Sequence, residues 1–267
     1  MEEMSDTGQV TSSAAEVYDE FFVPALFGAW APRVVAAAGL RPGMRVVDVA
    51  CGTGVLAIEA EKAVGPGDAV AGVDLNAGML AVAQRKTADI EWRQAPAEAL
   101  PYDTESFDAA LCQFGLMFFE DQKAAIAEMW RVLRPGGRLV IAVWDSLDNT
   151  AGYAAITALL SRLFGDAIAV LLKAPFALGD VGTLRSLLTA SGVVDPEVQR
   201  MAGEARFPSV RSWMHTDVRG WTLADKLDDA QYELLVSEAE KELRGFVTPG
   251  GAVRFDLPAL VASATKK

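Results

Sequence analysis

The sequence predicts an α/β fold, an open and mostly parallel sheet with helices on both faces. One observation is the stretch 44–56, MRVVDVACGTGVL, in which a valine-rich apolar run passes through a glycine turn straight into a helical pattern. That order is typical of a buried strand, a loop and a helix. The other is that strand and helix patterns keep alternating as far as residue 145, as they do around parallel sheets. The 267 residues, 51% of them hydrophobic, suffice for one large domain with an appended subdomain.

The glycine turn predicts a ligand site. Gly52 and Gly54 let the backbone bend tightly and approach a ligand, while the following helix directs its free N–H groups at it. With Ala57 they satisfy the dinucleotide pattern G-x-G-x-x-G/A,. Asp74 ends the next apolar run, where a ribose-binding carboxylate is expected,. Asp48, inside the strand, favours a cationic ligand, because a carboxylate there would repel a pyrophosphate and attract an ammonium group.

Residues 48–54, DVACGTG, resemble motif I, D-x-G-x-G-x-G, of the class I S-adenosylmethionine-dependent methyltransferases, whose cofactor carries an ammonium group. Ala50 replaces the first glycine of that motif. The tracts 90–121 and LRPGGRLVIAVW resemble the same family, most closely its type 11, UbiE-like small-molecule methyltransferases. The resemblance covers roughly residues 14–145. It implies a Rossmann-like sheet of seven strands, mostly parallel with an antiparallel last strand, and a helical cap.

The N-terminal region predicts a helix from Ser13 and a second helix that opens at Pro24 and ends at Gly39,. Residues 1–12 are polar and expected to fray. The helix pair is rich in aromatic residues, namely Tyr18, Phe21, Phe22, Phe27 and Trp30. In one interpretation, the helix pair packs on the domain through its apolar stripe. The resemblance implies a lid over the cofactor, with the Tyr18 hydroxyl reaching the methionine carboxylate or the substrate, and the two interpretations are compatible.

The resemblance also implies cofactor contacts. Asp74, at the end of a strand over 69–75, would accept hydrogen bonds from both ribose hydroxyls. Most members have an Asp that accepts from the adenine amine, but this chain has Pro96 there, so Glu98 or a backbone carbonyl is expected to replace it. The Ala97 N–H can still donate to the ring. The expected cofactor contacts are Asp48, Ala50, Gly52, Gly54, Asp74, Leu75, Met79, Ala97, Glu98 and Gln113.

An apolar cluster follows the strand predicted over 107–113 and includes Phe114, Met117, Phe118 and Phe119. It would serve either as core or as the methyl-acceptor pocket, since it lies at the mouth of the crevice. Strand 138–144 ends beside it with Trp144 and Asp145. The expected substrate contacts are Phe114, Met117 and Trp144.

Catalysis by this family is in-line attack on the sulfonium methyl, which depends on alignment in a site closed to water and needs at most one general base. His215 is the only histidine and is one candidate, because its ordinary pKa lies near neutrality. The alternative for His215 is a structural or surface role. Asp145 is the competing base, and Tyr18 would orient the acceptor.

The remaining elements follow from periodicity, capping residues and turns. Helices are expected over 55–64, from Asn76, over 121–133, twice within 151–178, and over 180–191, 209–219 and 228–246; strands are expected over 197–207 and in DLPALVASATKK. Four parts result: a helical lid over 1–40, a cofactor-binding core over 41–149, an apolar helical insert over 150–178, and 179–267, which completes the core and carries a substrate cap at about 208–248.

Composition excludes some partners. The formal net charge of −12 opposes binding to nucleic acid,. We find no apolar run of membrane-spanning length and no signal peptide pattern, which predicts a cytoplasmic protein. Cys51 and Cys112 are expected as reduced, buried thiols, and no cysteine and histidine cluster predicts a metal site. The apolar insert should cover the pocket, pack on a partner chain as in a homodimer, or both.

The expected function is therefore methyl transfer from S-adenosyl-L-methionine to the O, N or C atom of a small, aromatic or heterocyclic acceptor. A nicotinamide-dependent oxidoreductase is one alternative, which fits the glycines and Asp74 but not Asp48. A catalytically silent cofactor-binding protein is the other, and it would not need the aromatic cluster or the cap.

Overall fold

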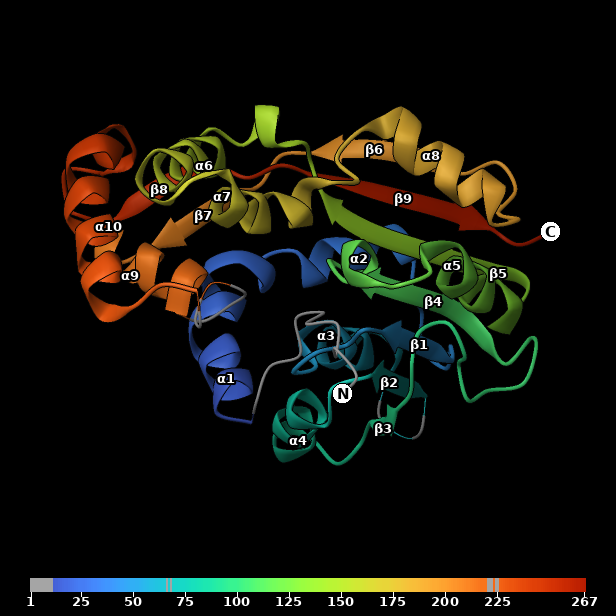
Figure 1. The fold of residues 1–267 in the computed structure, drawn as a ribbon. Coiled ribbons are helices and arrows are strands. Elements are labelled where there is room, and N and C mark those ends of the chain that lie inside the picture. The colour runs from blue at the N-terminus through green and yellow to red at the C-terminus, as the bar shows by residue number, and fades with distance from the viewer. Residues whose placement is uncertain (1–11, 66, 68, 220–222, 224–225) are drawn as a thin grey trace, which may run out of the picture.

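The computed structural model describes residues 12–65, 67, 69–219, 223 and 226–267. Its centre is a seven-stranded sheet in the order β3-β2-β1-β4-β5-β9-β6 (Figure 1). β9 runs antiparallel to both of its neighbours, and the pairs from β3 to β5 are parallel. The predicted fold class is confirmed. The strands are β1 Val46–Val49, β2 Val70–Asp74, β3 Glu91–Gln94, β4 Phe107–Gln113, β5 Leu133–Trp144, β6 Glu197–Met201 and β9 Ala259–Thr265.

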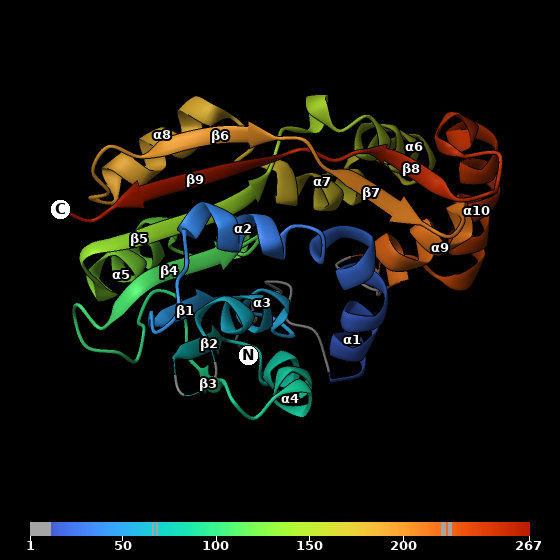
Figure 2. The same cartoon turned by 180° about the vertical axis from the view of Figure 1, so that it is seen from behind.

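Helices cover both faces of this sheet. α2 packs on α3 and crosses β4 and β5 on one face, whereas α5 and α8 pack together on the other (Figures 1 and 2). Polar N-caps begin several of them: the side chain of Asn76 accepts from the N–H groups of Gly78 and Met79, as expected. These helices are α2 Ala31–Ala38, α3 Val55–Val64, α4 Ala77–Lys86, α5 Gln122–Val132 and α8 Val181–Ala190.

The N-terminal helices differ from expectation. α1 spans Ser12–Val17 and continues into a π-helical segment, Tyr18–Phe27, that contains Pro24. The prediction that a helix opens at Pro24 is wrong. A π-helical turn joins an N–H to the carbonyl five residues back, as Gly28 does to Val23 at 2.7 Å, and the segment carries the proline that an α-helix would exclude. The expected fraying of the first residues lies outside the described ones.

The strand predicted over 197–207 is two strands. β6 ends at Met201, which pairs with Ala259, the first residue of β9. Outside the large sheet, the segment after β6 and the segment before β9 form a separate antiparallel pair. These strands are β7, Glu204–Phe207, and β8, Val253–Asp256. The stretch 197–207 thus pairs first with β9 and then with β8. No local sequence pattern indicates this change of partner, and β8 was not predicted.

This two-stranded ribbon carries a helical cap at one end of the molecule (Figure 1). The predicted apolar segment forms two helices, as expected, and its members pack with the later helices. The cap helices are α6 Ala151–Phe164, α7 Asp166–Lys173, α9 Val210–Met214 and α10 Asp229–Glu242.

The cap packs around a buried carboxylate, and its buried apolar residues are continuous with the core of the large sheet. Asp217 is fully buried and accepts hydrogen bonds from Trp213 Nε1 at 2.6 Å and from the Tyr153 hydroxyl at 3.2 Å. Phe207 stacks on Phe255 and on Trp213, and the rings of Phe255 and Trp213 meet at a tilt of 38°. Within the described chain no single helix is long and apolar enough to cross a membrane, although two bent helix pairs pass such a test together.

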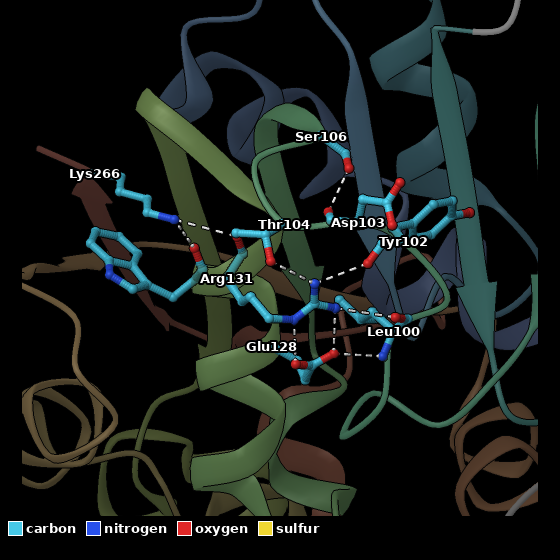
Figure 3. A network of polar contacts seen from close by, with 9 residues as sticks. Leu100, Tyr102, Asp103, Thr104, Ser106, Glu128, Arg131 and Lys266 are labelled. Atoms are coloured by element: carbon cyan, nitrogen blue, oxygen red, sulfur yellow. Dashed lines mark hydrogen bonds and ion pairs between the residues drawn. The ribbon is translucent and has the colours of Figure 1, made fainter.

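A polar network holds the loop between β3 and β4 against α5 (Figure 3). Arg131 donates to the carbonyls of Tyr102 at 3.0 Å and Leu100 at 3.3 Å, and it pairs with Glu128. Glu128 in turn accepts from the Leu100 N–H at 2.9 Å. Hydrogen bonding to Arg131 lowers the pKa of Glu128 below its usual range,. The network thereby positions a loop whose first residues line the cavity described next.

Candidate functional site

A cavity of about 320 Å³ opens at the C-terminal ends of β1, β2 and β4. Strand order reverses between β1 and β4, and ligands of open α/β sheets bind in the crevice at such a reversal. The cavity is lined by Tyr18, Phe27, Val49, Ala50, Gly52, Val73, Asp74, Leu75, Asn76, Met79, Ala95, Pro96, Ala97, Glu98, Gln113, Phe114, Gly115, Phe118, Phe119 and Glu120.

Asp74 presents a carboxylate in this wall. Its Oδ2 accepts from the Gly52 N–H and its Oδ1 accepts from the Asn76 N–H, both at 2.8 Å. Burial raises the pKa of Asp74, although the two N–H groups act in the opposite direction,. A carboxylate has about four acceptor sites, so each oxygen retains capacity for a ligand hydroxyl.

The two glycines of the turn have different environments. Gly52 lies in the cavity wall, and a Cβ built on it would meet only the Tyr18 ring among described atoms, at 3.8 Å. Gly54 does not line the cavity; its Cβ would lie 2.6 Å from the Trp92 ring. Since both have positive φ, both positions favour glycine, but Gly52 faces the cavity whereas Gly54 packs against Trp92.

Ala50, the departure from the family motif, adopts φ +58°. Left-handed backbone is strained for alanine. Gly115, in the facing loop, makes room for the extra methyl group: a Cβ on Gly115 would lie only 2.6 Å from that of Ala50. The substitution is therefore accommodated by a second small residue that lies far away in the sequence.

Asp48 lies behind the wall and is 1% exposed. Neither side-chain oxygen has a hydrogen-bond partner in the described part of the chain. Burial raises the pKa of Asp48 well above its usual range, and the Asp74 carboxylate adds to this. The nearby Ala57 N–H acts in the opposite direction, but it is not placed to form a hydrogen bond with Asp48. An unpaired buried carboxylate is costly, and a cation nearby offsets that cost.

Gln113, unlike Asp48, lies in the cavity wall itself. Its Nε2 donates to the Phe27 carbonyl at 3.3 Å, whereas its Oε1 is buried and has no partner among the described residues. Together with Asp48 it makes this end of the cavity suited to a ligand that donates hydrogen bonds and carries positive charge.

Another part of the wall is formed by the loop after β3 and by the segment after β4. Pro96 and Ala97 line it, and Glu98 lines it while accepting from the Asp121 N–H at 3.4 Å. Leu75, 50% exposed, and Phe118, 39% exposed, lie at its rim. Met79 is also in the wall. Of the ten expected cofactor residues, the structure places all in the lining except Asp48 and Gly54.

The N-terminal segment closes one side of the cavity. Tyr18 and Phe27 line it, and a Cβ built on Gly52 would lie 3.8 Å from the Tyr18 ring. Asp19 accepts from the Thr53 hydroxyl at 2.6 Å and pairs with Lys86, which donates to the Thr53 carbonyl at 2.9 Å. Burial and the neighbouring carboxylates of Asp74, Asp19 and Asp48 raise the pKa of Tyr18, so its hydroxyl remains protonated at neutral pH.

The structure does not bring the two candidate bases to the cavity. His215 is exposed and lies edge-on to Phe21 with ring centroids 5.7 Å apart. Asp145 is fully buried, pairs with Arg200, and accepts from Asn149 at 2.9 Å. Asp145 directly follows β5, its side chain pairs with Arg200 of β6, and it is not among the residues that line the cavity. Of the three expected catalytic residues only Tyr18 is in the wall.

Of the expected substrate contacts, Phe114 lines the cavity with φ +57°, and Trp144 lies behind it, stacked at 3.6 Å between ring centroids. Met117 is buried outside the lining. Sequence reasoning did not assign Phe27 or Glu120 to the site. Phe27 belongs to the unforeseen π-helical segment, and Glu120 carries no signal beyond its place before the Asp121 helix cap.

Residues 47–141 match the family described as methyltransferase domain. The chain is 38% identical over 157 residues to the ubiquinone/menaquinone biosynthesis C-methyltransferase UbiE of Hahella chejuensis, which covers 55% of this chain and 63% of that protein. It is 44% identical over 113 residues to the demethylmenaquinone methyltransferase of Renibacterium salmoninarum, covering 42% and 46%. The chain thus spans about half to three-fifths of the length of these curated relatives.

Solved structures share the fold. A putative methyltransferase from Bacillus halodurans has a TM-score of 0.61 at 18% identity, covering 88% of this chain and 98% of that one. Haemonchus contortus phosphoethanolamine N-methyltransferase 2, in complex with S-adenosyl-L-methionine, has a TM-score of 0.61 at 20% identity, covering 96% and 58%.

Proposed function

We propose that this chain is a class I S-adenosylmethionine-dependent methyltransferase of the UbiE-like group, as the match of residues 47–141 to a methyltransferase domain supports, and that it methylates a small, neutral acceptor. The observation that carries the proposal is the buried carboxylate of Asp48, which has no hydrogen-bond partner among the described residues and lies behind a cavity lined by the Asp74 carboxylate. That arrangement suits a ligand with an ammonium group at one end and a ribose beside it, and it disfavours a pyrophosphate.

The described residues fit this cofactor. Asp74 would accept the ribose hydroxyls, and the loop with Ala50 and Gly52 would receive the methionine end next to Gln113. The segment 95–98 would receive the adenine, with Glu98 as the side-chain acceptor in place of the family Asp. When bound, S-adenosylmethionine supplies a methyl group activated by the positively charged sulfur.

The acceptor class follows from the charges of the wall. The described lining contains the carboxylates of Asp74, Glu98 and Glu120 and no Lys, Arg or His side chain. An anionic acceptor would have no counter-charge there and would be repelled. Phe27, Phe114 and other aromatic rings favour a planar, apolar acceptor. A quinone-type ring, as in the ubiquinone and menaquinone of the relatives' names, is planar and uncharged and would meet both conditions.

The chain contributes binding, alignment and exclusion of water. Holding the acceptor atom in line with the methyl group supplies most of the rate enhancement. The Tyr18 hydroxyl, protonated at neutral pH because burial raises its pKa, acts as a hydrogen-bond donor that orients the acceptor. In this proposal neither His215 nor Asp145 removes a proton, because neither reaches the cavity.

Calorimetric titration with S-adenosylmethionine, S-adenosylhomocysteine and NAD tests the cofactor. We expect binding of the first two and none of NAD, and Asp48→Asn is expected to weaken both. NAD binding, or its appearance in Asp48→Asn, would support the oxidoreductase instead.

A radiolabelled methyl-transfer assay with neutral phenols and hydroquinones, each paired with a carboxylated analogue, tests the acceptor. Turnover of the neutral member of a pair alone is expected. Turnover of the carboxylated members would overturn the charge argument, and cofactor binding without any turnover would favour the silent cofactor-binding protein.

A cytoplasmic location and a homodimer stay predictions. Light scattering would check the homodimer.

A further inference from the structure

We propose that Gln113 links the cofactor to the lid: its amide oxygen accepts a hydrogen bond from the ammonium group of the cofactor while its amide nitrogen holds the lid through the Phe27 carbonyl. The lid is here the π-helical segment Tyr18–Phe27. The inference rests on the proposed function for the identity of the ligand. It makes Gln113 a residue that contacts the cofactor and also positions the lid.

The register of the sheet places Gln113 beside the glycine loop. In the parallel pair of β1 and β4, Asp48 is aligned with Leu111. Gln113 is the last residue of β4, and Ala50 directly follows β1, which ends at Val49. Both line the cavity. Gln113 consequently lies at the end of the cavity where Asp48 favours a cation.

The orientation of the Gln113 amide follows from its one hydrogen bond. Because Nε2 donates to the Phe27 carbonyl at 3.3 Å, Oε1 is directed away from Phe27. Oε1 is buried and has no partner among the described residues. A buried amide oxygen without a donor costs free energy, and an ammonium group, which only donates, would remove that cost.

The lid is attached at both ends. Near its first residue, Asp19 accepts from the Thr53 hydroxyl. At its last residue, the Phe27 carbonyl accepts from Gln113 and also from the Trp30 N–H at 3.0 Å. The Gln113 bond joins this end of the lid to the large sheet. Since the same amide faces the ligand, occupation of the cavity and closure of the lid are coupled through one side chain.

Two Gln113 variants separate the two contacts. Gln113→Met removes the acceptor and the donor, whereas Gln113→Glu keeps an acceptor and removes only the donor. The ligands are S-adenosylhomocysteine, which has the ammonium group, and methylthioadenosine, which lacks the whole amino-acid end. Calorimetry gives the affinities, and hydrogen exchange of residues 18–27 reports lid closure.

For Gln113→Met we expect about a tenfold loss of affinity for S-adenosylhomocysteine, as for loss of one hydrogen bond to a charged group, and less than a twofold change for methylthioadenosine. For Gln113→Glu we expect S-adenosylhomocysteine affinity to be kept or raised, while the ligand no longer slows exchange at 18–27. Thr53→Val is the matched control, which removes one hydrogen bond at the other end of the lid and should leave both affinities unchanged.

Equal losses for both ligands in Gln113→Met would make Gln113 merely structural and overturn the inference. So would ligand-induced protection of 18–27 in Gln113→Glu equal to that of the parent protein. Failure of the parent protein to bind S-adenosylhomocysteine would instead overturn the proposed function.

Discussion

Asp74 and Gly52 are joined by a hydrogen bond of 2.8 Å, in which the backbone N–H of Gly52 donates to Oδ2 of the carboxylate. The bond ties the end of β2 to the glycine loop across the floor of the cavity. A second N–H, from Asn76, holds the other oxygen at the same distance. The carboxylate expected to bind the ribose is therefore oriented by the protein itself, which reduces the ordering that a ligand must impose.

Replacing Asp74 by Ala is expected to weaken S-adenosylmethionine binding by about 1 to 3 kcal/mol, because a semi-buried acceptor for two hydroxyls is lost. Asp74→Asn, which keeps one acceptor oxygen, should lose less. Calorimetry measures the affinities, and thermal unfolding of both variants controls for the loss of the Gly52 bond. Unchanged affinity in a folded Asp74→Ala protein would rule out the ribose assignment.

The pair Ala50 and Gly115 predicts a coupled effect on stability. Ala50→Gly should stabilise the fold by up to about 1 kcal/mol, since it relieves a left-handed alanine. Gly115→Ala should destabilise it by roughly 1 to 3 kcal/mol through overpacking, because the new Cβ would lie 2.6 Å from that of Ala50. In the double variant much of this loss should disappear. Urea unfolding of all four proteins measures the coupling, and simple additivity would contradict the contact.

Gly52 and Gly54 should respond differently to substitution by alanine. Gly54→Ala places a Cβ 2.6 Å from the Trp92 ring and should lower the unfolding temperature. Gly52→Ala meets only Tyr18, at 3.8 Å, so it should lower cofactor affinity more than stability. Thermal unfolding and calorimetry on both variants decide the matter. A cofactor defect in a fully stable Gly54→Ala protein would show that both glycines face the ligand.

The buried carboxylate of the cap predicts a pH-dependent stability. Burial raises the pKa of Asp217 to about 7, while hydrogen bonds from Trp213 and Tyr153 act against it. Because the folded protein binds this proton more tightly than the unfolded chain, the protonated Asp217 contributes its full stability below about pH 4, near the ordinary pKa of an aspartate. This contribution is lost as the pH rises to about 7. The shift corresponds to up to about 4 kcal/mol.

Asp217→Asn cannot titrate, so the parent protein should lose stability relative to this variant between pH 4 and 8. Denaturant unfolding at pH 4, 6 and 8 gives the comparison. Parallel curves for the two proteins across that range would show that Asp217 does not titrate with a raised pKa.

The positions of His215 and Asp145 predict that neither acts as a base. His215→Ala should keep turnover and the shape of its pH profile, because the side chain is exposed beside Phe21. Asp145→Asn loses the ion pair with Arg200 and should reduce stability by roughly 1.5 to 3 kcal/mol, with turnover per folded molecule preserved. Initial rates from pH 6 to 9, corrected for the folded fraction, measure both. Loss of the acidic limb in either variant would restore that residue as the base.

The sequence alone determined the core of the fold and the outline of the site. Helix Val55–Val64 and strand Phe107–Gln113 coincide with their predicted ranges, because apolar periodicity and bounding turns are local signals. The glycine turn, Asp74 and the tract 95–98 were assigned to one ligand from short motifs, and the carboxyl ends of parallel strands necessarily meet at one edge of the sheet.

Only the tertiary structure decided the rest. It separates Gly52 from Gly54 through Trp92, and pairs Ala50 with Gly115, since contacts between distant segments leave no local pattern. It divides 197–207 where the partner strand β9 begins. It also directs Asp145 to Arg200 and leaves His215 outside the cavity, because a residue type makes a base chemically available but the packing of strands and helices determines which side chains reach the ligand.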